Sequence, residues 1–171
     1  PRRAWTRPQP TACARVREGG GSPSPSRAGE EAMIHLVIPG PPVGKARARI
    51  VYRERLGKYV GFTPEKTRTA EEEIGWIAKG AGCEMMEGPL RLTVRAYYPI
   101  PRSWPKWRQK EAEADKPSQR PTVKPDLDNV VKLVKDALTG IAWKDDAQIV
   151  DLIAHKYYGT TPRMIIDVDK S

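Results

Sequence analysis

Residues 124–132 read Lys-Pro-Asp-Leu-Asp-Asn-Val-Val-Lys and set two carboxylates, Asp126 and Asp128, two positions apart. Pro125 disfavours helical geometry at the residue before it, so the chain should reach Asp126 in an extended form. A helix should begin near Asp128, because Asp is a preferred N-cap and apolar residues recur at helical spacing after it. Residues two apart in an extended segment point the same way, so both carboxylates can face one point.

Further polar residues follow along and beyond this predicted helix. Lys132 lies four residues after Asp128, about one turn along the same helix face. The helix should end at 139–140, since glycine just past the last apolar position is the usual stop signal. A polar turn with Asp145 and Asp146 then leads into a strand-like run. If that strand lies beside the start of the helix, Asp145 or Asp146 joins the first two acids.

Such a group of acids predicts a divalent-metal site. Three converging carboxylates repel one another unless a cation lies among them, and Mg²⁺ prefers carboxylate oxygens. The expected ligands are Asp126, Asp128 and Asp146. Each feature alone also has a simpler interpretation: Asp128 as a helix cap, 145–146 as a solvated turn and Lys132 as a surface residue. Spacing alone leaves both interpretations open.

The chain around these acids is strongly basic. Its 171 residues include 30 Lys and Arg against 21 Asp and Glu, a net charge of +9. Residues 45–68 hold eight basic and two acidic residues. Lys45, Arg47 and Arg49 alternate, so an extended segment would place them along one edge that suits a nucleic-acid backbone. We expect these three residues and Lys124 to bind DNA, with a merely solvated loop as the alternative.

Residues 1–32 differ in kind from the rest, since they contain arginine but no lysine, a glycine run, Ser-Pro repeats and no Ile, Leu, Met or Phe. We expect a disordered basic leader, with Met33 as the natural start, or else an arm that contacts DNA. The leader lacks the apolar core of a signal peptide, and no stretch approaches the roughly 20 apolar residues of a membrane span. Only Cys13 and Cys83 occur, which agrees with a reducing cytoplasm.

Residues 33–171 should form one α+β domain with a small mixed sheet of about four strands and two main helices, in the order βαβαββ. The expected strands cover 34–38, 89–100, 148–158 and 163–168. The first helix should have Thr63 as N-cap and Pro64 at its first position. A long irregular or partly helical insert should fill residues 99–125, where Trp104 and Trp107 either contact nucleic acid or fasten the insert to the body.

Taken together, Met33 to Asp169 resembles the RusA family of Holliday junction resolvases, small endonucleases common in phages and prophages. Three stretches carry the resemblance: 124–132, the run Trp-Lys-Asp-Asp-Ala-Gln-Ile at 143–149, and the opening Pro-Pro-Val-Gly-Lys-Ala-Arg-Ala-Arg at 41–49. The short Asp-x-Asp string alone would be weak evidence, whereas the complete set is specific. The resemblance covers the body of the chain and none of the leader.

This resemblance implies a homodimeric α+β nuclease that acts on four-way junctions in DNA recombination and repair and needs Mg²⁺, with Mn²⁺ as a substitute. By position, the family's essential acids fall on Asp126, Asp128 and Asp146, its essential lysine falls on Lys132, and Asp145 is supporting. Two alternatives stay open. One is a non-catalytic DNA-binding protein with structural acids, and the other is a less selective nuclease acting on flaps or forks.

Overall fold

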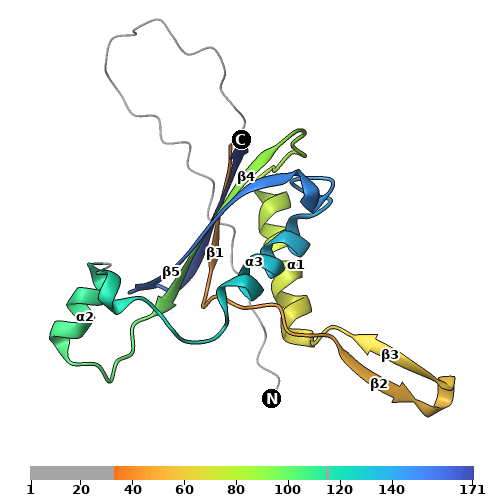
Figure 1. Ribbon diagram of the computed structural model, residues 1–171, viewed down its shortest axis with the longest axis horizontal. Helices are drawn as coiled ribbons and strands as arrows, with labels where there is room; N and C mark the ends of the chain where they lie inside the picture. The colour runs from red at the N-terminus through yellow and green to blue at the C-terminus, as the bar shows by residue number, and fades with distance from the viewer. Residues whose placement is uncertain (1–32, 115) are drawn as a thin grey trace, which may run out of the picture.

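The computed structural model describes residues 33–114 and 116–171, so the predicted leader lies outside the described residues. A four-stranded mixed sheet carries two helices on one face, and a two-stranded hairpin projects from the body (Figure 1). The main sheet contains β1 (Ile34–Pro39), β4 (Leu90–Pro99), β5 (Ile149–Gly159) and β6 (Arg163–Lys170), and the hairpin contains β2 (Arg49–Arg53) and β3 (Lys58–Phe62). The helices are α1 (Glu65–Gly80), α2 (Lys106–Glu113) and α3 (Leu127–Leu138). The predicted α+β class is confirmed; the hairpin is an addition to it, whereas α2 lies within the insert that was expected to be irregular or partly helical.

The main sheet has the strand order β1-β6-β4-β5, in which β4 and β5 are parallel and the other pairs are antiparallel. Alternate residues of β4 are buried from Leu90 to Tyr98, as the sequence pattern predicted. These side chains and the apolar stripe of α3 form the core, with Trp143 fully buried beside them. Burial of apolar surface therefore fixes both the sheet face and the position of α3 over it.

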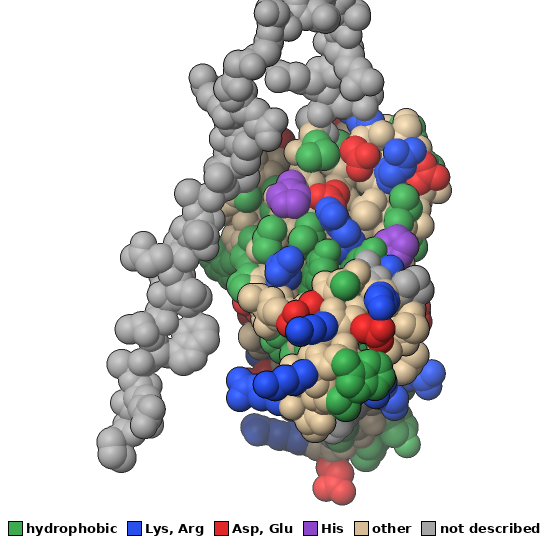
Figure 2. All heavy atoms as spheres, turned by 90° about the vertical axis from the view of Figure 1, so that its left-hand side faces the viewer, with side chains coloured by type: hydrophobic (Ala, Val, Ile, Leu, Met, Phe, Trp, Pro, Cys, Tyr) green, Lys and Arg blue, Asp and Glu red, His purple; other side chains and the backbone are tan. Residues whose placement is uncertain are grey.

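The other face of the main sheet is left open by α1 and α3. Figure 2 shows this face, with hydrophobic side chains gathered near histidines. Val37 and Ile153 are exposed, and the rings of Tyr97 and Tyr157 stack with 5.2 Å between their centroids. Since β5 lies at the end of the strand order, one of its edges is unpaired among residues 33–114 and 116–171.

Both predicted helix starts are wrong by one or two residues. The N-cap of α3 is Asp126 instead of Asp128, and the N-cap of α1 is Pro64 instead of Thr63. Neither residue caps its helix through a side-chain hydrogen bond. The Val130 N–H already donates to the Asp126 carbonyl at 3.1 Å, so the first helical turn closes before Asp128 could cap it. Asp126 itself is extended, as expected, after a cis Lys124–Pro125 peptide bond.

Residues 42–48, here called the strap, connect β1 to the hairpin across the first turns of α1 and α3. The Lys45 N–H donates to the Asn129 carbonyl at 2.8 Å, and the Ala46 N–H donates to the buried Thr67 hydroxyl at 3.2 Å. The strap is therefore bound to both helices by its backbone.

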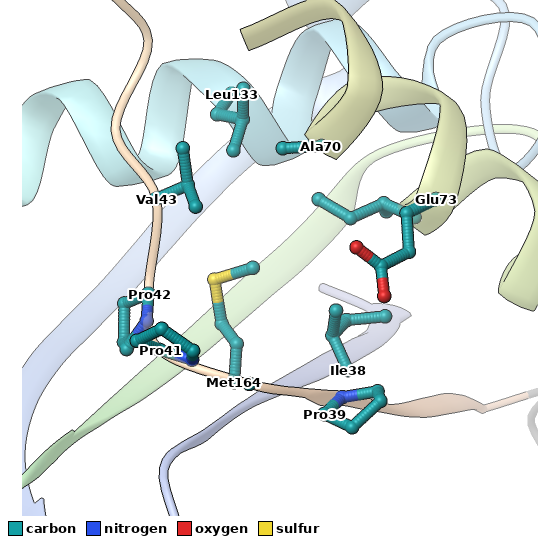
Figure 3. A pocket seen from close by; sticks show the side chains of 11 residues that line it. Ile38, Pro39, Pro41, Pro42, Val43, Ala70, Glu73, Leu133 and Met164 are labelled. Atoms are coloured by element: carbon teal, nitrogen blue, oxygen red, sulfur yellow. The ribbon is translucent and has the colours of Figure 1, made fainter. Parts of the chain in front are cut away.

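The beginning of the strap packs closely on the core. Figure 3 shows Val43 facing Leu133 and Ala70 across a cavity of about 30 Å³, which Pro42 also lines. A cavity of that size holds only a few water molecules, so it is not a substrate pocket. It is better understood as a small packing defect beneath the strap.

Gly44 is required where the strap approaches α3 most closely. A Cβ built on Gly44 would lie 2.5 Å from Cβ of Pro125 and 3.2 Å from Cβ of Asn129. The Pro125 ring is rigid, so the backbone must move to relieve the overlap. The strap therefore needs glycine at this position for packing, although its φ is ordinary.

We expect Gly44→Ala to lower the free energy of unfolding by about 1–3 kcal/mol, the usual cost of overpacking. Gly80→Ala is the matched control, because its Cβ meets nothing within 4 Å and alanine favours the helix end. Thermal or urea denaturation of both variants measures the difference. Equal stabilities for the two variants would show that the strap adjusts freely.

Candidate active site

The strap, residues 124–126 and the first turns of α1 and α3 line an open groove with a volume of about 1120 Å³. Its basic lining residues are Lys45, Arg47, Lys66, Lys124 and Lys132, and its acidic ones are Asp126 and Asp128. The groove thus combines one acidic pair with a mostly basic wall. Such a surface attracts a polyanion while it keeps two carboxylates available.

The acidic pair lies at the N-terminal end of α3, where Asp126 is the N-cap and Asp128 is in the first turn. The backbone N–H groups and the helix dipole favour negative charge there. Lys132 Nζ donates to Asp128 Oδ2 at 3.1 Å, so the predicted one-turn pairing is present. This hydrogen bond lowers the pKa of Asp128, which is exposed. Asp128 is therefore ionised at neutral pH.

Tyr98 supports the turn that carries the acidic pair, and the sequence analysis missed this role. Its hydroxyl donates to the Pro125 carbonyl at 3.2 Å. Burial, and then the negative charge of Asp126, raise the pKa of Tyr98 to about 12. The hydroxyl therefore stays protonated and able to donate. The sequence showed Tyr98 only as one residue in an alternating core pattern, and its polar end was the available signal.

Asp146 lies in a different environment, in the short 3-10 helix η3 (Asp146–Gln148) after α3. Its Oδ1 accepts from the Thr139 hydroxyl at 2.9 Å and from the Trp143 indole N–H at 3.0 Å. Lys135 Nζ lies 3.3 Å from Oδ2. Partial burial pushes the pKa of Asp146 upward, but the hydrogen bonds from Trp143, Thr139 and Lys135 outweigh it, so the pKa is lowered. This carboxylate is bound by three donors of its own chain.

Asp145 caps the same short helix. Its carboxylate accepts from the Ala147 N–H at 2.7 Å, and the Gln148 side chain accepts from the Asp145 N–H at 3.2 Å. These two contacts form a capping box, a local motif that fixes the start of a helix. Asp145 therefore has a structural role here, beside Asp146.

A single chain does not bring the three predicted carboxylates together. Asp126 and Asp146 lie at opposite ends of α3, whose 12 residues span about 18 Å. Among residues 33–114 and 116–171, no three Asp, Glu, His or Cys side chains are grouped to hold a metal ion. The sequence left open that β5 begins beside the start of α3. In the structure Pro125 instead contacts Tyr98, near the carboxyl ends of β4 and β5.

The basic residues expected to bind DNA differ in their exposure and in their pairing with acidic side chains. Lys45 pairs with Asp136 and lies 3.7 Å from Glu71, so much of its charge is neutralised within the chain. Arg47 and Lys124 are exposed in the groove. Arg49 begins β2, and its side chain lies outside the part that the structure describes. DNA binding by these residues stays a prediction.

The two tryptophans of the insert have different surroundings. Trp104 packs edge-on against Tyr158 at 5.0 Å between centroids, and the Arg108 guanidinium lies 3.7 Å from its ring centre. Trp104 thus fastens the insert to β5, as one of the two interpretations proposed. Trp107, on α2, is exposed.

No helix within the described ranges has the length and apolar character needed to cross a membrane.

Comparison with known proteins places this chain in a family. Residues 39–169 match the family described as endodeoxyribonuclease RusA. The uncharacterized protein YqaN of Bacillus subtilis (strain 168) is 37% identical over 132 residues, which cover 77% of this chain and 92% of that protein. Residues 39–169, the range that matches the family, include the groove, both ends of α3 and the hairpin. On this evidence the chain belongs to the endodeoxyribonuclease RusA family.

Proposed function

We propose that this protein is a Mg²⁺-dependent endonuclease that resolves four-way DNA junctions in recombination and repair, and that it acts as a homodimer. The observation that carries the proposal is the exposed pair Asp126 and Asp128 in the wall of a basic groove. Membership of a nuclease family and the net charge of +9 support it. Mn²⁺ is expected to substitute for Mg²⁺.

The acidic pair fits Mg²⁺ by its chemistry. This ion is commonly held by one or two carboxylates, keeps several waters and takes further oxygen ligands from a substrate phosphate. Asp126 and Asp128 both line the groove and are exposed, so their oxygens are accessible to an ion and to DNA. When bound, Mg²⁺ supplies Lewis-acid stabilisation and lowers the pKa of an attacking water.

The basic residues of the groove then act on the DNA strand. Lys132, already paired with Asp128, is placed to stabilise the negative charge that develops on the scissile phosphate. Arg47 and Lys124 hold neighbouring phosphates of the backbone. Because these contacts release counterions, binding should weaken steeply as salt rises.

In a homodimer, Asp146 of one subunit can lie near the acidic pair of the other subunit. Asp146 begins η3, which directly precedes β5. Residues 123–125 lie near the other end of β5, where Lys156 Nζ donates to the Val123 carbonyl at 2.6 Å. Antiparallel pairing of two β5 edges would bring Asp146 of each chain toward the acidic pair of the other. Exposed apolar side chains of β5 support this contact: Val150, Leu152 and Ile153. We therefore propose that each active site uses both subunits.

We expect Asp126→Asn to reduce junction cleavage at least about a hundred-fold, because loss of metal-based stabilisation costs several kcal/mol. Junction binding should be unchanged or tighter, since one negative charge leaves a DNA-binding groove. Asp169→Asn is the matched control, since it removes a carboxylate on β6 that lies 3.9 Å from Arg91 and does not line the groove. Cleavage and binding of a labelled junction measure both effects. Full activity of Asp126→Asn would exclude the acidic pair from catalysis.

Mixed dimers test whether the site is shared. We expect Asp126→Asn and Asp146→Asn to be inactive separately, and their co-expressed mixture to regain activity, because each mixed dimer has one intact shared site. Random pairing would restore about a quarter of the wild-type sites. Asn suits position 146, since its amide oxygen can still accept from Trp143 and Thr139.

A mixture of Asp126→Asn with Asp128→Asn is the control for that experiment. Both changes lie on the same side of the shared site, so no mixed dimer contains an intact one. Restored activity only in the first mixture supports the shared site. Inactivity in both mixtures, with mixed dimers shown by mass measurement, would place all the required residues within one chain.

A further inference from the structure

The hairpin of β2 and β3 exposes large apolar side chains far from the core. Tyr59 is 73% exposed, Ile50 72% and Tyr52 51%. Figure 1 shows the hairpin projecting beyond α1, on the side of the molecule opposite α2. A hairpin that buries little apolar surface is only marginally stable by itself, and exposed apolar side chains on such an element indicate a binding surface.

The register of the two strands places three of these exposed side chains on the same face of the hairpin. Tyr52 pairs with Tyr59, and Ile50 pairs with Gly61. Because residues two apart share a side of a strand, Ile50 and the two tyrosines lie on one face of the hairpin. The two rings are 5.1 Å apart between centroids and tilted by 60°. The face therefore presents an aromatic pair beside an aliphatic side chain.

Charge identifies the kind of partner that this aromatic face suits. Residues 45–68 carry eight basic and two acidic residues, a local net charge of +6. Arg55 and Lys58, near the hairpin turn, are exposed. Two hairpins of this charge would repel each other, so a second copy of the chain is a poor occupant. Exposed aromatic rings among cations are typical of surfaces that bind nucleic acid with accessible bases.

The position of the hairpin connects it to the candidate active site. Ala48 precedes β2 and Pro64 follows β3, and both line the groove that contains the acidic pair. A DNA strand lying in the groove would thus continue onto the hairpin. A continuous duplex offers no base faces there, whereas the branch point of a junction exposes the faces of its terminal base pairs.

We infer that Tyr52 and Tyr59 stack on bases at the branch point of DNA, so that the hairpin acts as a wedge beside the cleavage groove. The inference rests on the proposed function only for the identity of the DNA, since stacking needs no cleavage. It assigns the hairpin a role in selecting branched over continuous DNA.

The test uses an inactive Asp126→Asn background and a synthetic four-way junction with 2-aminopurine next to the branch point. The emission of this base depends on its stacking, so it should change about two-fold or more when the background protein binds. Adding Tyr52→Ala and Tyr59→Ala should abolish the change and weaken junction binding roughly ten-fold, with little effect on linear duplex. Adding Tyr52→Phe and Tyr59→Phe should preserve both, because the rings remain.

Trp76→Ala is the control for loss of an exposed aromatic ring, since Trp76 is exposed on α1 nine residues beyond Thr67 of the groove. It should bind as the background does. If the double alanine variant shows the same emission change and the same junction affinity as the background protein, the inference is overturned. An equal loss of junction and duplex binding would also overturn it. Dissociation of the variant into monomers in sedimentation would assign the hairpin to a subunit contact instead. If the background protein produces the emission change but the wild-type chain does not cleave the junction with Mg²⁺, the nuclease proposal is refuted and the stacking inference stands.

Discussion

The close packing of the strap on α3 is the contact on which the groove depends. Because Gly44 has no side chain, the strap comes near enough for the Lys45 N–H to bond the Asn129 carbonyl at 2.8 Å. This contact places a basic segment directly beside the acidic pair. In the proposed mechanism the two charges have separate tasks, since the basic wall attracts the DNA backbone and the acids hold a cation. Without that cation, the acids would repel the phosphate that must approach them.

Helix α3 separates two carboxylate sites that differ in their hydrogen bonding. Asp126 and Asp128 are exposed at its first turn, whereas Asp146 is held at the other end by Thr139, Trp143 and Lys135. A side chain with three donors in its own chain is rigidly placed, which suits a residue that must meet a second subunit in a fixed position. Under the proposed arrangement, dimer formation and metal binding depend on each other. The two-fold symmetry of a four-way junction then matches two sites on opposed strands.

The sequence predicted those parts of the fold that follow from periodicity. The alternation in β4 and the apolar stripe of α3 are both present, and α3 ends before Gly140, whose φ is +79°. The helix starts were missed because backbone geometry at Pro64 and Pro125, not a capping side chain, sets them. The hairpin was missed because basic residues interrupt its apolar pattern. Asp146 could not be placed, since distance along the chain does not determine which end of a helix a later turn approaches.

The central claim is tested most directly by incubating the purified protein with a labelled four-way junction and with a linear duplex of the same sequence, each with and without Mg²⁺. We expect paired nicks in opposed junction strands when Mg²⁺ is present, no nicks in EDTA, and an intact duplex throughout. Junction binding without cleavage under any divalent ion would instead identify a non-catalytic DNA-binding protein. Equal cutting of duplex and junction would contradict the structure-specific activity.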